Sequence, residues 1–258
     1  MCVIAWRWTP DEEIVLTLWA NRDEWLKRPT RPLAPWRTQQ SIIGARDLEA
    51  GGGWLLVDRH RGDVAALTNL REAPGSSLNE PPRPSRGELP VQALLNRVFS
   101  LEAEQASRYA GFNLIVFRQA QRFAQHISNS DEKAVKLHRG TGSISNGKLS
   151  EKWPKQQALE SAIDKAQHLH EVDWLEAAWK ALSDQSQPDP LELPDTGVGT
   201  LRERELAPVF INTPTYGTRQ STVIKRSSKG HLKIWERRWT GHGGALRHGD
   251  VFWTNKHD

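Results

Sequence analysis

Cysteine is almost absent from this 258-residue chain, which contains a single one, Cys2. One cysteine excludes an internal disulfide and is typical of proteins from a reducing compartment, so we expect a cytoplasmic protein. No apolar run reaches the roughly 20 residues that a membrane-spanning helix needs, so we expect no transmembrane segment. The first residues also lack the basic region and long apolar core of a secretory signal.

Tyrosine and phenylalanine are scarce as well, with two and six residues against 12 tryptophans. We expect most of the tryptophans to pack in the core or on strand faces. Trp6, Trp8 and Trp19 leave a second interpretation open, because they lie in the hairpin predicted for the first residues and could line an aromatic pocket for a flat or lipidic ligand.

Positive and negative charges are nearly balanced, and the net charge is only +4. No block of like charges stands out, so we expect no nucleic-acid partner. Binding of nucleic acid through the basic stretch 225–256 is a weaker alternative. The length suits one large domain or two small ones, and the order of elements described below favours a single domain over 1–258.

The first two dozen residues form the most informative stretch. Two apolar runs, 3–8 and 14–20, flank a turn signal at 9–11 and predict a β-hairpin. In an antiparallel hairpin the start of the first strand lies beside the end of the second. We therefore expect Cys2 to lie next to the charged cluster 21–24, whose sequence is Asn-Arg-Asp-Glu.

This neighbourhood has a chemical interpretation. If Met1 is removed, Cys2 carries a thiol and a free α-amine, and an amine with an ordinary pKa near ~8 can act as a base. Arg22 could stabilise the thiolate or orient a carbonyl, and Asp23 could pair with the ammonium group. The plain alternative is that Cys2 is a small buried apolar residue and that the cluster forms a surface salt bridge.

The remaining elements predict an α+β fold, with strands before and after a central block of helices. Segment 27–36, rich in proline and arginine, is expected to be a loop, and 200–205 a charged mobile segment. Strands are predicted at 42–46, 54–57, 64–69, 111–117, 122–129, 140–146, 209–211, 216–224, 231–239 and 250–254, and helices at 85–98, 101–108, 155–168 and 171–182.

Short motifs spread along almost the whole chain resemble the NRDE family, also called the transport and Golgi organisation protein 2 family. Each motif is weak alone, but together and in this order they are specific. They are Met1-Cys2, Asn21-Arg22-Asp23-Glu24, Gly44-Ala45-Arg46-Asp47, Gly52-Gly53-Trp54-Leu55, Leu67-Thr68-Asn69-Leu70-Arg71, Ser85-Arg86-Gly87-Glu88, Gly111-Phe112-Asn113-Leu114, Ser145-Asn146, Trp153-Pro154-Lys155 and Tyr216-Gly217-Thr218-Arg219-Gln220-Ser221-Thr222.

That family is similar to the N-terminal-nucleophile hydrolases, in particular the cysteine branch of penicillin V acylases, bile salt hydrolases and acid ceramidase. The resemblance implies an αββα sandwich of two mainly antiparallel sheets flanked by helices. It also implies a Cys2 nucleophile that hydrolyses a non-peptide C–N amide bond of a small acylated molecule, without any required cofactor. The matching site positions are Cys2, Arg22, Asp23, Asn69, Asn146 and Arg219, with the two asparagines in the oxyanion hole.

Without the resemblance, Asn69 and Asn146 are expected to be turn residues that close strands, and Arg219 a member of a structural ion pair. With it, we expect all of them to share one site around Cys2.

The family resemblance also implies a non-enzymatic alternative, a carrier of haem or of acyl-CoA that uses the same pocket. Cys2 or Met1 could then be an axial ligand of haem as bound cargo. No metal site is expected, because one cysteine and scattered histidines do not give zinc-ligand spacing. The histidines considered, each expected at the surface, are His60, His126, His138, His231, His242 and His248.

Overall fold

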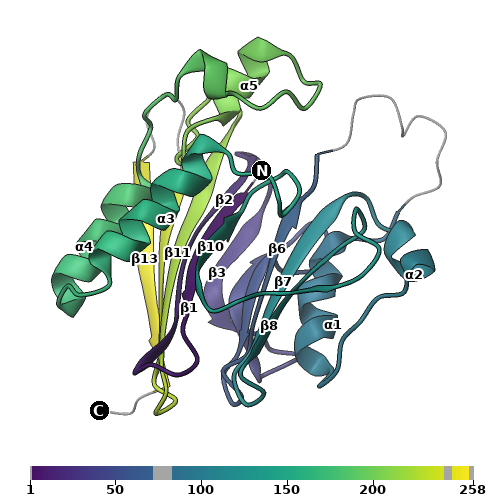
Figure 1. Ribbon diagram of the computed structural model, residues 1–258, viewed down its shortest axis with the longest axis vertical. Helices are drawn as coiled ribbons and strands as arrows, with labels where there is room; N and C mark the ends of the chain where they lie inside the picture. The colour runs from purple at the N-terminus through teal and green to yellow at the C-terminus, as the bar shows by residue number, and fades with distance from the viewer. Residues whose placement is uncertain (1, 72–82, 241–245, 256–258) are drawn as a thin grey trace.

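The computed structural model describes residues 2–71, 83–240 and 246–255. It has two antiparallel sheets that lie face to face, with helices on their outer sides (Figure 1). The first sheet, sheet A, has the order β10-β1-β2-β11-β12-β13. Its strands are β1 (Cys2–Trp8), β2 (Ile14–Trp25), β10 (Gly140–Ile144), β11 (Tyr216–Ser227), β12 (Leu232–Thr240) and β13 (Leu246–Thr254).

The second sheet, sheet B, follows chain order from β3 to β9, so each strand pairs with its neighbour in sequence. Such meanders need only short connections. The strands are β3 (Thr30–Pro35), β4 (Ile42–Asp47), β5 (Leu55–Asp58), β6 (Val64–Asn69), β7 (Phe112–Arg118), β8 (Phe123–Ser128) and β9 (Val135–Lys136).

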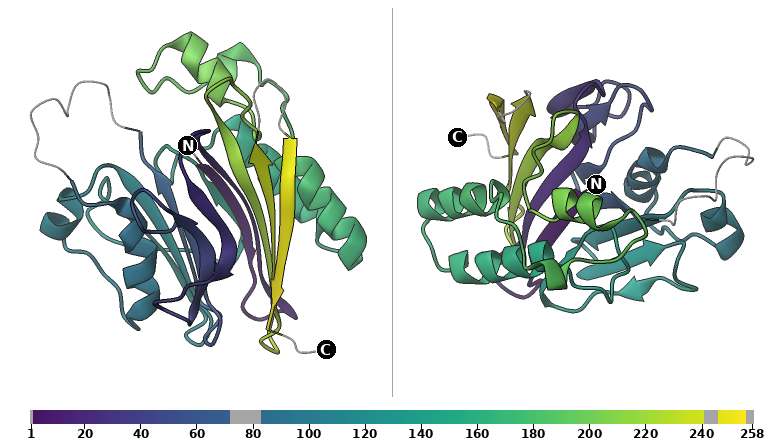
Figure 2. Two further views of the ribbon diagram at one scale, coloured as in Figure 1. Left: turned by 180° about the vertical axis from the view of Figure 1, so that it is seen from behind. Right: turned by 90° about the horizontal axis from the view of Figure 1, so that it is seen from above.

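Helices cover the two outer faces, and the view from above shows them on opposite sides of the paired sheets (Figure 2). Helix α1 (Leu89–Leu95) packs on sheet B, with α2 (Ala103–Ser107) beyond it, while α3 (Pro154–Ala166) and α4 (Glu171–Leu182) pack on sheet A. Helix α5 (Thr200–Leu206) lies at the end of the molecule where β1 begins (Figure 1). The expected α+β fold of two antiparallel sheets flanked by helices is confirmed. Short 3₁₀ turns occupy Arg86–Glu88 and Pro190–Glu192.

Strands β1 and β2 of sheet A are apolar at odd and even positions alike, and both of their faces are buried. Trp6 and Trp8 point toward sheet B and contact Phe117, with ring centroids 6.0 and 5.5 Å apart. Trp19 points the other way and packs against Trp174 of α4. These three tryptophans therefore belong to the core, and the aromatic-pocket interpretation is wrong for them.

The predicted first hairpin is confirmed, and its register places Cys2 opposite Arg22 and Val3 opposite Asn21. The second strand runs further than expected, through the charged cluster to Trp25, because β11 pairs with it along its whole length. Arg22 and Asp23 are consequently buried inside a sheet, and the surface salt-bridge alternative is wrong for them.

Three other predictions are wrong. Segment 27–36 contains β3, whose Pro32 is tolerated because it lies at a register shift in a strand at the sheet edge. Segment 200–205 is helical and buries Glu203 rather than being a charged mobile stretch. Segment 209–211 lies between elements, with its apolar side chains packed into neighbouring clusters.

Some predictions cannot be placed. Met1 as a soft ligand and His242 lie outside the described residues, as does Lys256 of the basic stretch 225–256.

Candidate active site around Cys2

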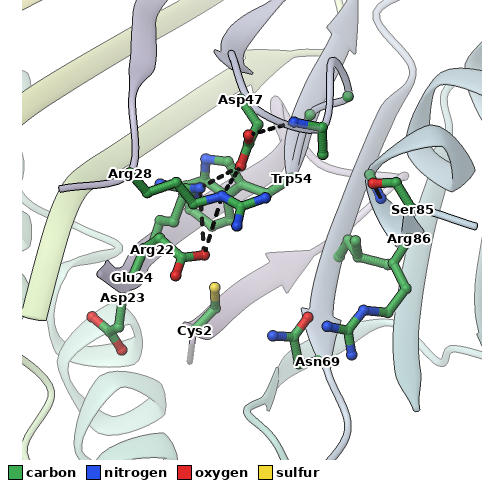
Figure 3. Close-up of a pocket in the computed structure, with 15 residues that line it drawn as sticks. Cys2, Arg22, Asp23, Glu24, Arg28, Asp47, Trp54, Asn69, Ser85 and Arg86 are labelled. Carbon is green, nitrogen blue, oxygen red and sulfur yellow. Dashed lines mark hydrogen bonds and ion pairs between the residues drawn. The ribbon is translucent and has the colours of Figure 1, made fainter. Parts of the chain in front are cut away.

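A small polar cavity of about 140 Å³ lies between the two sheets where β1 begins. Figure 3 shows Cys2, Arg22, Asp23, Glu24 and Asn69 facing this space from several elements. Four of the six predicted site residues, Cys2 included, are among its lining. The full lining is Cys2, Arg22, Asp23, Glu24, Arg28, Asp47, Ala50, Gly52, Gly53, Trp54, Leu67, Asn69, Ser85, Arg86 and Gly87.

Cys2 is the first residue of β1, and it is 7% exposed. Its main-chain nitrogen donates a hydrogen bond to Asn146 Oδ1 at 3.3 Å, and its carbonyl accepts one from Ser145 Oγ at 2.9 Å. Burial raises the pKa of the Cys2 thiol, although Arg22 opposes that shift. Cys2 is thus held firmly by its main chain, with a thiol that is mostly protonated at neutral pH.

The two predicted oxyanion asparagines are neighbours, but they have different roles. Asn146 is fully buried, and its Nδ2 donates to the main-chain carbonyl of Asn69 at 2.7 Å. Its amide group therefore bridges the start of β1 and the end of β6. Asn69 lines the cavity, so its side chain is the amide that a reacting carbonyl in the cavity could contact.

Arg22 projects from β2 into a network of arginines and carboxylates (Figure 3). Its Nη2 lies 2.9 Å from Asp47 Oδ2 and 3.6 Å from Glu24 Oε2, and Arg28 Nε contacts the same Asp47 oxygen at 2.6 Å. Burial by itself would disfavour the Asp47 carboxylate, but the bond from Arg28 and the nearby Arg22 charge outweigh burial and lower the pKa of Asp47. Asp47 therefore stays ionised and fixes both guanidinium groups.

Asp23 lies deep beside the cavity, with Oδ1 accepting from Thr218 Oγ1 at 2.6 Å. Burial raises the pKa of Asp23. Lys155 is buried nearby at the start of α3, and its Nζ donates to the Leu206 carbonyl at 2.9 Å. Burial lowers the pKa of Lys155 to about 8, while the charges of Asp23 and Cys2 oppose that shift. A buried amine with a pKa of about 8 therefore lies near Asp23, outside the cavity lining.

Arg219 lies outside the cavity lining. It occupies the register shift in β11 between Thr218 and Gln220, and its Nη1 donates to the carbonyls of Trp25, Leu26 and Arg28. Arg219 therefore supports the backbone that carries Arg28, and its expected place beside the nucleophile stays a prediction.

Sequence reasoning did not assign Asp47, Arg28, Arg86 or Lys155 to the site. Asp47, Arg86 and Lys155 each belong to a motif that carried the family resemblance, which is the signal that could have pointed to them. Arg28 carried no such signal, because it lies in the segment that was expected to be a loop.

Few of the groups that a haem or metal site would use gather here. Trp54 is the tryptophan of the cavity lining.

His126 is not at the surface as expected: it is fully buried in sheet B, where its Nε2 bonds Asn113 Oδ1 at 3.0 Å. Within the described ranges, no three histidine, cysteine, aspartate or glutamate residues cluster closely enough to hold a metal ion. None of the helices described there has the length and apolarity that crossing a bilayer requires.

Comparison with known proteins agrees with this arrangement of motifs. The profile of the Transport and Golgi organisation 2 family matches residues 1–241. A Transport and Golgi organization protein 2 homolog from Bos taurus is 29% identical over 268 residues, covering 93% of this chain and 94% of its own length. The Homo sapiens homolog is 29% identical over 261 residues, and the Mus musculus homolog 26% over 264, each covering 92% of both chains.

Proposed function

This chain belongs to the Transport and Golgi organisation 2 family, and from that premise we propose that Cys2 is the nucleophile of a hydrolase that cleaves a small non-peptide amide. One observation carries the proposal. The main-chain nitrogen of Cys2 is 3.3 Å from Asn146 Oδ1, while the residue itself lines a charged cavity. An N-terminal nucleophile of this kind uses a thiol and a main-chain nitrogen that is held in place. Here the side-chain amide of Asn146 holds that nitrogen by accepting its hydrogen bond.

The reaction would run in two balanced steps. A base takes the proton of Cys2 Sγ, the sulfur bonds to the carbonyl carbon, and the C–N bond breaks as the departing nitrogen receives that proton. Water then attacks the carbonyl carbon of the resulting thioester while the base takes one of its protons. The C–S bond breaks, the carboxylic acid leaves, and the base returns the proton to the sulfur. Asn69 could donate to the oxyanion of each step, and one such donor contributes roughly 3 kcal/mol in known cases.

Removal of Met1 would create the base. The α-amine of Cys2 would then occupy the position of the present peptide nitrogen, where Asn146 Oδ1 can accept one of its hydrogens and leave its lone pair for the thiol proton. In a chain that retains Met1, this nitrogen is an amide and cannot act as a base. Lys155, whose pKa burial lowers to about 8, is then the nearby amine that could do so.

The size of the cavity restricts the substrate class. A volume of about 140 Å³ is below the roughly 300 Å³ at which sites for drug-sized ligands begin. The cavity would therefore take only the reacting end of a molecule. The lining carries Asp23, Glu24 and Asp47 as well as three arginines, so its charges can contact the polar groups of an amide without selecting one sign of substrate charge.

The test begins with the intact mass of the protein purified from its own cells, which shows whether Met1 is present. An amide panel is then assayed by primary-amine release with the wild-type chain and with Cys2→Ala. We expect turnover in the first and none in the second, with a thioester adduct on Cys2 seen by mass spectrometry. Equal turnover by Cys2→Ala would refute the proposal.

The carrier of haem or acyl-CoA remains a second candidate, because the arginines of the lining could contact a propionate or phosphate group. A ligand of that size would have to leave most of its body outside the cavity. Absorbance titration with haem, and retention of acyl-CoA on gel filtration, would test it with Cys2→Ala as the comparison. A flat titration and no retained acyl-CoA would exclude the carrier.

A further inference from the structure

A second concave region, called here the arginine groove, lies at the β3–β4 edge of sheet B. It measures about 570 Å³. Its wall includes Trp36, which packs in the same apolar cluster as the α1 residue Leu89, so the groove is on the side of sheet B that carries α1. Its lining is Arg31, Pro32, Ala34, Pro35, Trp36, Arg37, Thr38, Gly44, Arg46, Asp47, Leu48 and Gly51.

The groove is separate from the Cys2 cavity. Asp47 lines both spaces, but Arg46 and Asp47 are consecutive residues of β4 and their side chains point to opposite faces of the sheet. Arg46 faces the groove, and Asp47 holds Arg22 on the inner side. An inference about the groove therefore stands without the proposed function.

Two of its arginines are placed directly against each other. In the β3–β4 register Arg31 lies opposite Arg46, so both side chains project from the same face of the sheet. Like charges opposed in this way destabilise a strand pair. Arg37 adds a third positive charge from the segment after β3. In the part of the chain that the structure describes, no carboxylate forms an ion pair with any of the three.

Arg46 is held in place for binding. Its guanidinium stacks over the Trp36 ring at 4.8 Å, and its Nε donates to the Gly51 carbonyl at 2.8 Å. Trp36 is itself fixed by a bond from Nε1 to the Gly44 carbonyl at 3.1 Å. A planar guanidinium that is already oriented loses little freedom when it binds an anion.

We propose that the arginine groove binds a small phosphate-bearing anion, such as a diphosphate group, whose charge offsets the repulsion between Arg31, Arg37 and Arg46. Arginine and phosphate pair in a bidentate manner, and a fixed guanidinium favours that geometry. A volume of about 570 Å³ lies within the roughly 300–1,000 Å³ of small-molecule sites. The concave shape therefore fits a small ligand better than a flat membrane or nucleic-acid surface.

Inorganic pyrophosphate is the probe, titrated calorimetrically into the full chain at about 0.15 M ionic strength. Arg31→Gln and Arg37→Gln are the test variants, since both side chains are exposed and neither has an ion pair among the described residues. Each is expected to raise Kd about tenfold, as for loss of one charge-assisted hydrogen bond. Arg97→Gln removes the same charge from an exposed position outside the groove and should leave Kd within about twofold.

The melting temperature, measured without and with pyrophosphate, gives a second test. Arg31→Gln should melt no lower than the wild type, because it relieves the repulsion with Arg46, and pyrophosphate should raise the melting temperature of the wild type more than that of the variant. The proposal is overturned if pyrophosphate does not bind, if the groove variants bind like the wild type, or if Arg97→Gln weakens binding equally. Equal binding of citrate would overturn the assignment to phosphate.

Discussion

The main-chain nitrogen of Cys2 donates a hydrogen bond to the side chain of Asn146, a residue 144 positions later in the chain. The same amide donates from Nδ2 to the Asn69 carbonyl at 2.7 Å, so one buried side chain joins the start of β1 to the end of β6. These strands belong to different sheets. Asn146 therefore closes the stacked sheets at the end where the cavity lies.

Asn146→Asp should destabilise the protein. The change keeps the side-chain shape but places a carboxylate oxygen against the Asn69 carbonyl, where the wild type has a donor, in a fully buried position. Loss of the donor and burial of a charge should lower the free energy of unfolding by about 2–4 kcal/mol, measured by urea denaturation. Asn96→Asp, at an exposed position, is the control. A variant as stable as the wild type would show that Asn146 does not join the sheets.

The pH at which the single cysteine becomes reactive toward an alkylating reagent should be higher than for an ordinary thiol. Burial raises the pKa of the Cys2 thiol, and only the thiolate reacts. In a chain that retains Met1, the rate of iodoacetamide labelling at neutral pH should be lower than in the urea-unfolded chain, and its midpoint should lie above the ordinary value of about 8.5. Mass spectrometry over a pH series measures this. A native midpoint below that value would contradict the prediction.

Lys155→Met should change how stability depends on pH. Burial lowers the pKa of Lys155 to about 8 from its ordinary 10.5, so between these values the unfolded chain binds more protons than the folded chain. Stability from this group therefore rises with pH across that window, by at most about 3 kcal/mol. The variant should lose the rise, as measured by urea denaturation at pH 7.5 and 10. Lys180→Met, on the exposed side of α4, should keep it.

Glu236→Gln should stabilise the protein at neutral pH. Glu236 is buried between the sheets, where its carboxyl accepts from the Leu33 nitrogen at 2.9 Å and lies 3.3 Å from Gln220 Nε2. Burial raises the pKa of Glu236 from 4.5 to about 7. The folded state thus holds a proton that the unfolded state has lost, and stability falls as pH rises from about 4.5 to 7.

The glutamine should remove that fall and gain about 1–3 kcal/mol at pH 8. It keeps the acceptor for Leu33, and its new NH₂ can donate to Gln220 Oε1, which has no hydrogen-bond partner among the described residues. Chemical denaturation at pH 5 and 8 measures the difference. Equal slopes for the variant and the wild type would contradict a raised pKa at this position.

Arg219→Ala separates a supporting role from a catalytic one. Arg219 donates to three carbonyls in the turn after β2, so its loss should remove these bonds and lower the free energy of unfolding by about 1–3 kcal/mol, although the Trp25 carbonyl keeps its bond from the Arg28 nitrogen. The alkylation rate of Cys2 should stay within about twofold of the wild type. An unchanged stability with a strongly altered Cys2 labelling rate would instead support the role beside the nucleophile.

Much of the architecture was accessible from the sequence because it depends on local pattern. Apolar runs separated by turn residues predicted the first hairpin, and hairpin geometry alone placed Cys2 beside the cluster 21–24. Motif resemblance pointed to Asn69 and Asn146, which the structure brings together beside the start of β1. The edge strand β3 was missed because a proline-rich segment is locally typical of a loop, whereas pairing with β4 stabilises it as a strand.

The charged network around the cavity required the tertiary structure. Asp47 meets Arg22, and Lys155 comes near Asp23, only because sheet B stacks on sheet A and α3 and α5 close over its end. The opposition of Arg31 and Arg46 depends likewise on the register of one strand pair. By itself the sequence determined which local elements form and which residue types they carry. Which charges became buried, paired or opposed was decided by long-range packing, because solvation and charge pairing depend on neighbours that are far away along the chain.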